Sequence, residues 1–185
     1  YLPLNFVMPL QMKKINSIVV ENPHVYDSMI MDLYRQMNRE EEQWNLLQDE
    51  EFFAMDKYCD LLMSPADLHF PKKEIQKELI PEIIREIESS EKFEALLEQH
   101  GDFVQLMSQI CDQYKYLLEY DFDFSLKEYL KHYKVTLADL EGSALEKLLE
   151  YIPVVQELTG KTVFFLHGYG DYLSENDFKH LQKWA

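Results

Sequence analysis

The sequence predicts an α/β protein whose sheet-forming parts are separated by a helical insertion. Near the C-terminus, a short apolar run between two helical patterns has the length of a strand. Near the N-terminus, strand-like and helical patterns also alternate. Between them, apolar residues recur only at helical spacing over a long stretch. We therefore expect an α/β domain, discontinuous in sequence, with an all-helical domain inserted into it.

Residues 158–183 have the clearest pattern of strand, turn and helix. The apolar run 163–166 is too short for a core helix, which favours a buried strand. Gly160 can end the helix that precedes this run in the left-handed conformation. Gly168 and Gly170 allow a sharp turn after the run. Ser174 is a good N-cap with Asp177 three residues later, which predicts the start of a helix.

The segment Gly160-Lys161-Thr162 resembles the end of a phosphate-binding P-loop but lacks the context of that loop. A P-loop needs a glycine five residues before Gly160, where this chain has Val155. It also needs a strand before it and a helix after it, because the helix N-terminus holds the phosphate. Here the order is reversed, so we interpret the segment as a helix end followed by the first residues of a strand.

The N-terminal part, residues 1–69, alternates between the two patterns. The β-branched run at 17–20 ends at an Asn-Pro break. Residues 24–37 place apolar side chains at helical spacing, which predicts an amphipathic helix. We expect further strands at 44–47 and 58–63.

The middle part is predicted to be helical throughout. From Ile75 onward isoleucines and leucines recur every four residues, and Pro71 suits a first helical turn. Pro81 is expected to kink or restart this helix, and Gly101 to bend the next one.

Two more helices are expected at about 125–133 and 145–158. The predicted domains are then residues 1–69 and 147–185 for the α/β head and residues 70–146 for the helical leg.

The composition limits the classes of function. The chain has 185 residues, 46% of them hydrophobic, and a net charge of −16. Such an acidic chain disfavours simple electrostatic binding of nucleic acid. Its charge repels phosphates unless basic residues cluster on the surface or bound cations neutralise the acidic groups. Two distant cysteines without a CxxC motif fit a reducing compartment. We find neither an apolar run long enough to span a membrane nor a secretory signal, and expect a cytoplasmic protein.

The best candidate site is a set of four acidic residues, Glu119, Asp121, Asp123 and Glu128. Asp121 and Asp123 alternate with phenylalanines, so an extended segment would bury the rings and expose both carboxylates. Such oxygen ligands suit calcium, but the segment is no EF-hand because the turn glycine is missing. The residues leave two interpretations open, a calcium site or an acidic cap for the helix that begins near Ser125.

Catalytic interpretations have less support. Cys59 with His69 has the residue types of a nucleophile and its base, but nothing fixes the geometry. The same holds for Ser174 with His167 and Asp171. The six histidines show no zinc spacing. We therefore expect no enzymatic activity.

Several segments follow one another in a distinctive order: a strand, the helix ENPHVYDSMIMDLYRQ, a long helical insertion, KEYLKHYKV, and ELTGKTVFFLHGYGDYLSENDFKHL. This order resembles the Csn-two family, the small adaptation protein of type II-A CRISPR–Cas systems. The resemblance implies an α/β head similar to an inactivated nucleotide-binding fold, and a helical leg. It also implies a ring-shaped homotetramer that binds the ends of double-stranded DNA, needs calcium (Ca²⁺) and acts with other Cas proteins in spacer acquisition. It places the calcium at Glu119, Asp121, Asp123 and Glu128.

Two features depart from the family pattern. Members usually continue with another strand and a basic tail, whereas this chain stops at Ala185, so we expect its C-terminal end to be missing. Independently of the family pattern, the chain starts without Met, which suggests a piece of a longer protein. The head segment QWNLLQDEEFFAMDK is acidic where lysines are expected. The nearest basic candidates for DNA contact are Arg39, Lys57, Lys72 and Lys73.

Two alternatives to DNA binding stay open. The acidic surface suits a protein-interaction scaffold that recruits basic partners such as Cas nucleases. A weak nucleotide-hydrolysing or DNA-cutting enzyme on the same scaffold is the other alternative.

Overall fold

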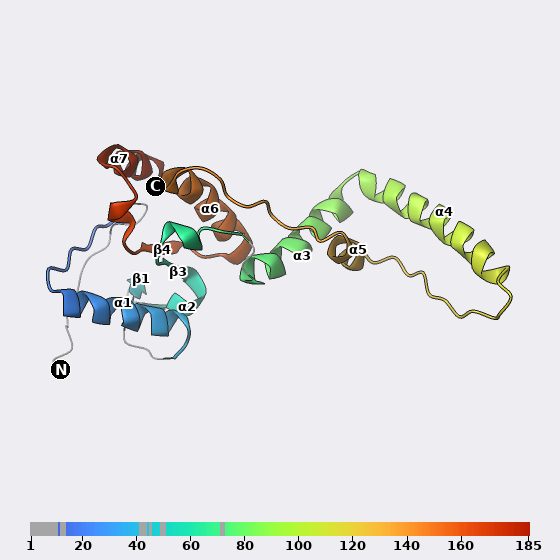
Figure 1. The fold of residues 1–185 in the computed structure, drawn as a ribbon, viewed down its shortest axis with the longest axis horizontal. Helices are drawn as coiled ribbons and strands as arrows, with labels where there is room; N and C mark the ends of the chain where they lie inside the picture. The colour runs from blue at the N-terminus through green and yellow to red at the C-terminus, as the bar shows by residue number, and fades with distance from the viewer. Residues whose placement is uncertain (1–10, 12–13, 41–43, 45, 49–50, 71–72) are drawn as a thin grey trace. The chain divides into compact units, whose positions relative to one another are not determined.

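The computed structural model describes residues 11, 14–40, 44, 46–48, 51–70 and 73–185 (Figure 1). The chain divides into two compact units. We call Tyr1–His69 with Asp139–Ala185 the discontinuous unit, and Phe70–Ala138 the inserted unit. Helices and strands are both present, as the predicted α/β class requires, but the sheets are small.

A two-stranded parallel sheet joins the two sequence segments of the discontinuous unit. Strand β3 (Cys59–Leu62) pairs with β4 (Val163–Leu166), in a register that sets Cys59 opposite Val163. Two further backbone hydrogen bonds extend the ladder at its ends, from Thr162 to Tyr58 at 2.8 Å and from His167 to Leu62 at 2.9 Å. Residues far apart in the sequence are thus held side by side across the whole insertion.

One face of this sheet packs on helix α1 (Pro23–Met37). Side chains alternate between the faces of a strand, so Cys59 and Leu61 point to the same side. Cys59 forms a buried cluster with Leu33 of α1, and Leu61 packs against that cluster. Asn22 caps α1 by accepting the His24 N–H at 3.0 Å, and Pro23 occupies its first turn.

The other face lies against helix α6 (Ala144–Thr159), as Figure 1 shows. Tyr151 of α6 is fully buried and donates a hydrogen bond to Asp60 of β3 at 3.2 Å. Helix α7 (Glu175–Trp184) contacts α6 and buries Leu181.

Short elements complete the discontinuous unit. Strands β1 (Leu46–Gln48) and β2 (Glu51–Phe53) form an antiparallel hairpin that leads into α2 (Met55–Tyr58). The 3₁₀ turns η1 (Pro65–Asp67) and η2 (Tyr169–Asp171) follow β3 and β4.

The inserted unit contains α3 (Lys73–Ser89), α4 (Lys92–Asp112) and α5 (Leu126–His132), and α3 contacts both of the others. Helix α4 contributes no buried side chain, although it is the longest helix described. No helix among the described residues is long and apolar enough to cross a membrane.

One sequence-based expectation about an individual element is wrong, and two breakpoints expected in helices do not interrupt them. Residues 17–20 form no strand, and the side chain of Val19 is 85% exposed. Helix α3 continues through Pro81, whose position is exposed, so that water can satisfy the backbone carbonyl of Lys77. Helix α4 continues through Gly101, because one glycine costs only about 1 kcal/mol in a long helix.

The strand expected at 163–166 is present, but its residues are half-buried rather than buried. A strand reaches full burial when sheet neighbours and helices enclose it on all sides. In the described part of the chain the sheet has only two strands, so each strand has one open edge.

Candidate functional site

The segment that connects α4 to α5 carries three of the four predicted metal ligands and forms neither helix nor strand. Phe122 and Phe124 are half-buried, whereas Asp121 and Asp123 are exposed. The predicted alternation, with the rings inward and the carboxylates outward, is therefore confirmed. It follows that both carboxylates are accessible to ions.

His100 of α4 holds this segment in place. Its Nε2 lies 2.8 Å from the carbonyl oxygen of Phe122, and its Nδ1 lies 3.0 Å from the hydroxyl of Tyr129 on α5. A carbonyl only accepts, so Nε2 carries the hydrogen, and Nδ1 of a neutral ring accepts from Tyr129. The ring of Phe124 lies 5.0 Å from the imidazole. One side chain thus ties α4 and α5 to the acidic segment.

No pattern in the sequence indicated this role of His100, because its partners are 22 and 29 residues away. Helical spacing identifies the face of a helix but not the loop that packs on it.

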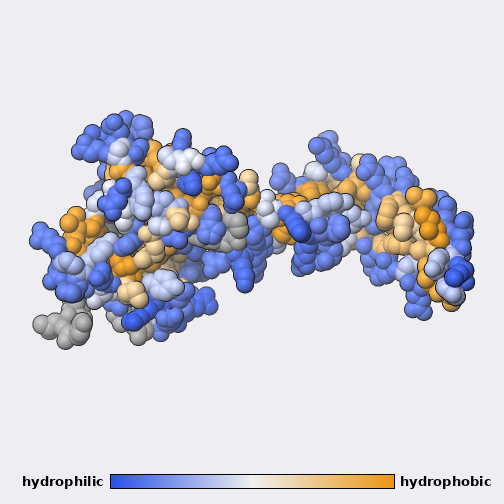
Figure 2. Space-filling model, viewed as in Figure 1, coloured by the Kyte–Doolittle hydropathy of each residue, from blue (hydrophilic) through white to orange (hydrophobic). Residues whose placement is uncertain are grey.

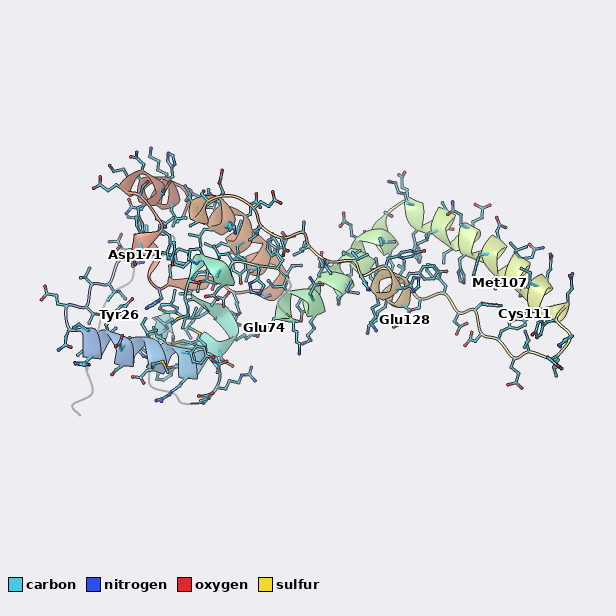
Figure 3. All side chains as sticks on the ribbon, viewed as in Figure 1. Tyr26, Glu74, Met107, Cys111, Glu128 and Asp171 are labelled. Atoms are coloured by element: carbon cyan, nitrogen blue, oxygen red, sulfur yellow. The ribbon has the colours of Figure 1, made fainter. Side chains whose placement is uncertain are left out.

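The four carboxylates make separate local contacts. Asp121 Oδ1 accepts the Asp123 N–H at 3.0 Å. Glu128, which projects from α5 in Figure 3, forms an ion pair with Lys131 at 2.9 Å. Its backbone N–H donates to the N-cap Ser125 at 3.4 Å. These contacts are those expected of an acidic loop that leads into a capped helix.

The carboxylate oxygens are donors of the kind that calcium takes, but as placed they do not form a coordination group. Among the residues that the structure describes, no three His, Cys, Asp or Glu side chains lie where they could hold one metal ion. Calcium takes roughly six to eight oxygen ligands. The arrangement described here therefore does not fit the ion without movement of the segment.

The predicted DNA contacts lie in different parts of the fold. Arg39 follows α1, and its Nε pairs with Asp56 at 2.8 Å. Lys57 lies 4.7 Å from the ring centre of Tyr58, and its hydrogen bond with Tyr58 raises its pKa. Lys73 is exposed at the start of α3, in the inserted unit. Lys72 lies outside the described residues.

A group of basic side chains on α5 and directly after it was not among these candidates. We call it the α5 basic surface; its members are Lys127, Lys131, His132 and Lys134, all of them exposed. The segment KEYLKHYK holds three lysines and one glutamate in an otherwise acidic chain. Local lysine density was the signal available for it in the sequence.

The residues considered as nucleophiles have structural contacts. Burial raises the pKa of the Cys59 thiol to about 12, which keeps it protonated at neutral pH. His69, its supposed partner, is exposed. Ser174 caps α7, where its hydroxyl donates to Asp177 at 2.7 Å. His167 stacks on Tyr26 with ring centres 5.4 Å apart.

The Gly160-Lys161-Thr162 segment connects a helix to a strand, as the sequence analysis predicts. Gly160 ends α6 in the left-handed conformation, with φ 73°. Lys161 Nζ lies 3.3 Å from Asp60 Oδ1, and both side chains are largely buried. The lysine therefore pairs with a carboxylate of the fold.

One small hollow, of about 230 Å³, lies where α4 ends, and its lining comes from residues 111, 112 and 114–118. Pockets for small molecules usually measure about 300–1,000 Å³. The hollow is too small to suggest such a ligand.

Comparison of the chain with models of known protein families and with curated proteins finds no match.

Proposed function

We propose that this protein binds the ends of double-stranded DNA as a ring-shaped homotetramer. It serves the acquisition of new spacers by a type II-A CRISPR–Cas system in the bacterial cytoplasm, alongside other Cas proteins and without catalysis of its own. The starting point is the order of sequence segments, which resembles the Csn-two family.

The observation that carries the proposal is the parallel pairing of β3 with β4 around an inserted helical unit. An α/β part interrupted by a helical part is the architecture that the resemblance implies. A fold alone does not define a function, so DNA binding needs a direct test.

Assembly of several copies is supported by the apolar face of α4. Phe103, Leu106 and Ile110 follow one another at helical spacing, and all three are exposed. Leu117, in the segment that follows, is 98% exposed. Figure 2 shows hydrophobic residues gathered at this end of the inserted unit. Association would remove this surface from water, which is favourable in proportion to the apolar area buried.

The net charge of −16 restricts how DNA is held. The duplex must approach through locally basic surfaces, since the mean field of the chain repels phosphates. Phosphate contacts release counterions, so we expect affinity to fall steeply with salt and to depend little on sequence.

Calcium enters the proposal through the resemblance, because the carboxylates as placed do not gather. If the acidic segment rearranges around the ion, calcium stabilises the folded protein, by about 2.7 kcal/mol at a hundredfold excess over Kd. We expect a chelator to lower the melting temperature, and Asp123→Ala to remove that response. Asp102→Ala on α4 is the control. A melting temperature indifferent to calcium would show that the segment only caps α5.

A protein-interaction scaffold is the second candidate. The strong negative charge and the exposed apolar side chains favour it, because both recruit protein partners. The enzymatic alternative, a weak nucleotidase or nuclease, gains no support from Cys59, Ser174 or Lys161, which have the structural contacts described above.

The decisive experiment compares binding to a linear duplex and to a covalently closed circle of the same sequence. A closed ring must be threaded from an end, so the linear form should bind and the circle should not. Equal affinity for both forms contradicts the closed ring, and no affinity for either favours the scaffold.

A further inference from the structure

We infer that the α5 basic surface, Lys127, Lys131, His132 and Lys134, contacts the phosphate backbone of the duplex. This inference rests on the proposed function and assigns its contact residues. Lysine ammonium groups are common phosphate ligands, because they act as compact point charges. Lys127 and Lys131 are four residues apart and therefore lie on the same side of the helix.

Charges are separated along α5. Asp121 and Asp123 precede the helix, and Lys127 and Glu128 lie in its first turn, whereas Lys131, His132 and Lys134 lie at or directly after its end. The seven residues of α5 span about 10 Å, which is close to the Debye length at physiological salt. A phosphate near Lys131 and Lys134 is therefore screened from Asp121 and Asp123, whereas one near Lys127 lies closer to them.

The side chains of the α5 basic surface are accessible. Lys127 and Lys134 have no ion-pair partner among the described residues, and Tyr133 between them is 71% exposed. Lys131 pairs with Glu128, but both side chains are more than half exposed, and such exposed pairs open easily. Three lysines and a tyrosine hydroxyl are thus available as donors to phosphate oxygens.

The backbone at Lys134 shows how α5 ends. Lys134 has φ 52°, in the left-handed region that favours glycine at this position after a helix. Its N–H donates to Lys131, and the N–H of Val135 donates to Leu130, both at 3.0 Å. A lysine is therefore present where glycine would be less strained. Arg39 has the same conformation directly after α1, with φ 61°, so the conformation marks a helix end.

The test measures anisotropy of a labelled linear duplex from 50 to 200 mM salt, with the full chain and with calcium present. One variant carries Lys127, Lys131 and Lys134→Gln. The matched control carries Lys92, Lys179 and Lys183→Gln, with the same change of charge on other helices. Log affinity falls with log salt, and each phosphate contact contributes about 0.9 to the steepness of that fall. Loss of three contacts should therefore make the slope shallower by about 2.7. The control should keep the wild-type slope.

Lys134→Gly separates binding from folding. This variant should melt at a higher temperature than the wild type, because glycine relieves the left-handed strain. Its salt dependence of duplex binding should nevertheless be shallower by about one, because one phosphate contact is lost.

The outcomes separate the two proposals. If the wild type binds duplex but the triple variant keeps the wild-type slope, or the control loses as much, the surface assignment is wrong and the proposed function stands. If the triple variant changes the oligomeric mass instead, the surface is a self-contact and the inference fails. If the wild type binds no duplex at 50 mM salt, both proposals fall.

Discussion

Two serines each fix the start of a helix through a reciprocal pair of hydrogen bonds. Ser143 accepts the Glu146 N–H at 3.3 Å, while Glu146 accepts the Ser143 N–H at 2.7 Å. Ser174 and Asp177 repeat the arrangement on α7. The hydrogen bond from the Ser143 backbone lowers the pKa of Glu146, and that from the Ser174 hydroxyl lowers the pKa of Asp177. Both carboxylates are therefore more stable as anions in the folded state.

A lowered pKa makes stability depend on pH in one direction. The contribution of Glu146 is fully present above the pKa of an unfolded glutamate, about 4.3, and is lost as pH falls through the lower folded value. Glu146→Gln should thus melt below the wild type at pH 7, and the difference should shrink toward zero in acid. Thermal melts across pH 2.5–7 measure this. Glu157→Gln on the same helix is the control. A difference that stays constant with pH contradicts the prediction.

Local interactions explain which side chains the sequence predicts well. Ser174 with Asp177 and the left-handed Gly160 involve neighbours within a few residues, so spacing alone identifies them. The ion pair of Lys161 with Asp60 spans 101 residues and exists only because β3 pairs with β4. No local pattern contains that information.

At the scale of elements, His100 makes the acidic segment part of the helical packing. His100→Ala removes the donor to the Phe122 carbonyl and the acceptor for Tyr129. Amide exchange within α5 should become about tenfold faster, which corresponds to roughly 1.4 kcal/mol of local stability. Hydrogen exchange read by mass spectrometry measures this effect.

Gln99→Ala, at the exposed neighbouring position on α4, is the control for that measurement. Unchanged exchange within α5 in the His100 variant would mean that the two hydrogen bonds of His100 add nothing to the local stability of α5.

Helices were predicted more reliably than strands for a physical reason. The helix expected at 24–37 is observed at Pro23–Met37, because an N-cap, a proline and an apolar stripe all lie within it. A strand needs a partner, and the β-branched run at 17–20 has none in the described chain. The strand expected at 44–47 is observed at Leu46–Gln48, where it pairs with a neighbour that the sequence analysis did not predict.

Of the candidate site, the exposure of Asp121 and Asp123 was predictable, but the contacts of Glu128 and His100 were not.

At the scale of the whole molecule, the apolar face of α4 is the surface most in need of a partner. Leu106 is 56% exposed and Ile110 is 55% exposed, so neither contributes to the core of its own chain. Charged residues at these positions should leave the fold intact and disrupt only association between copies.

We therefore predict that Leu106→Glu with Ile110→Glu lowers the mass in solution to that of a smaller species, while the melting curve keeps its shape. The control is Gln105→Glu with Gln109→Glu, which adds the same charge at exposed neighbouring positions of α4 and should retain the wild-type mass. Sedimentation velocity measures both variants.

If the variant with Leu106→Glu and Ile110→Glu keeps the wild-type mass, this face is not the contact between copies. If the glutamine pair dissociates equally, added charge rather than the apolar face controls assembly. A smaller species that also loses duplex binding would link assembly to the proposed ring, since a closed ring holds DNA only when it is complete.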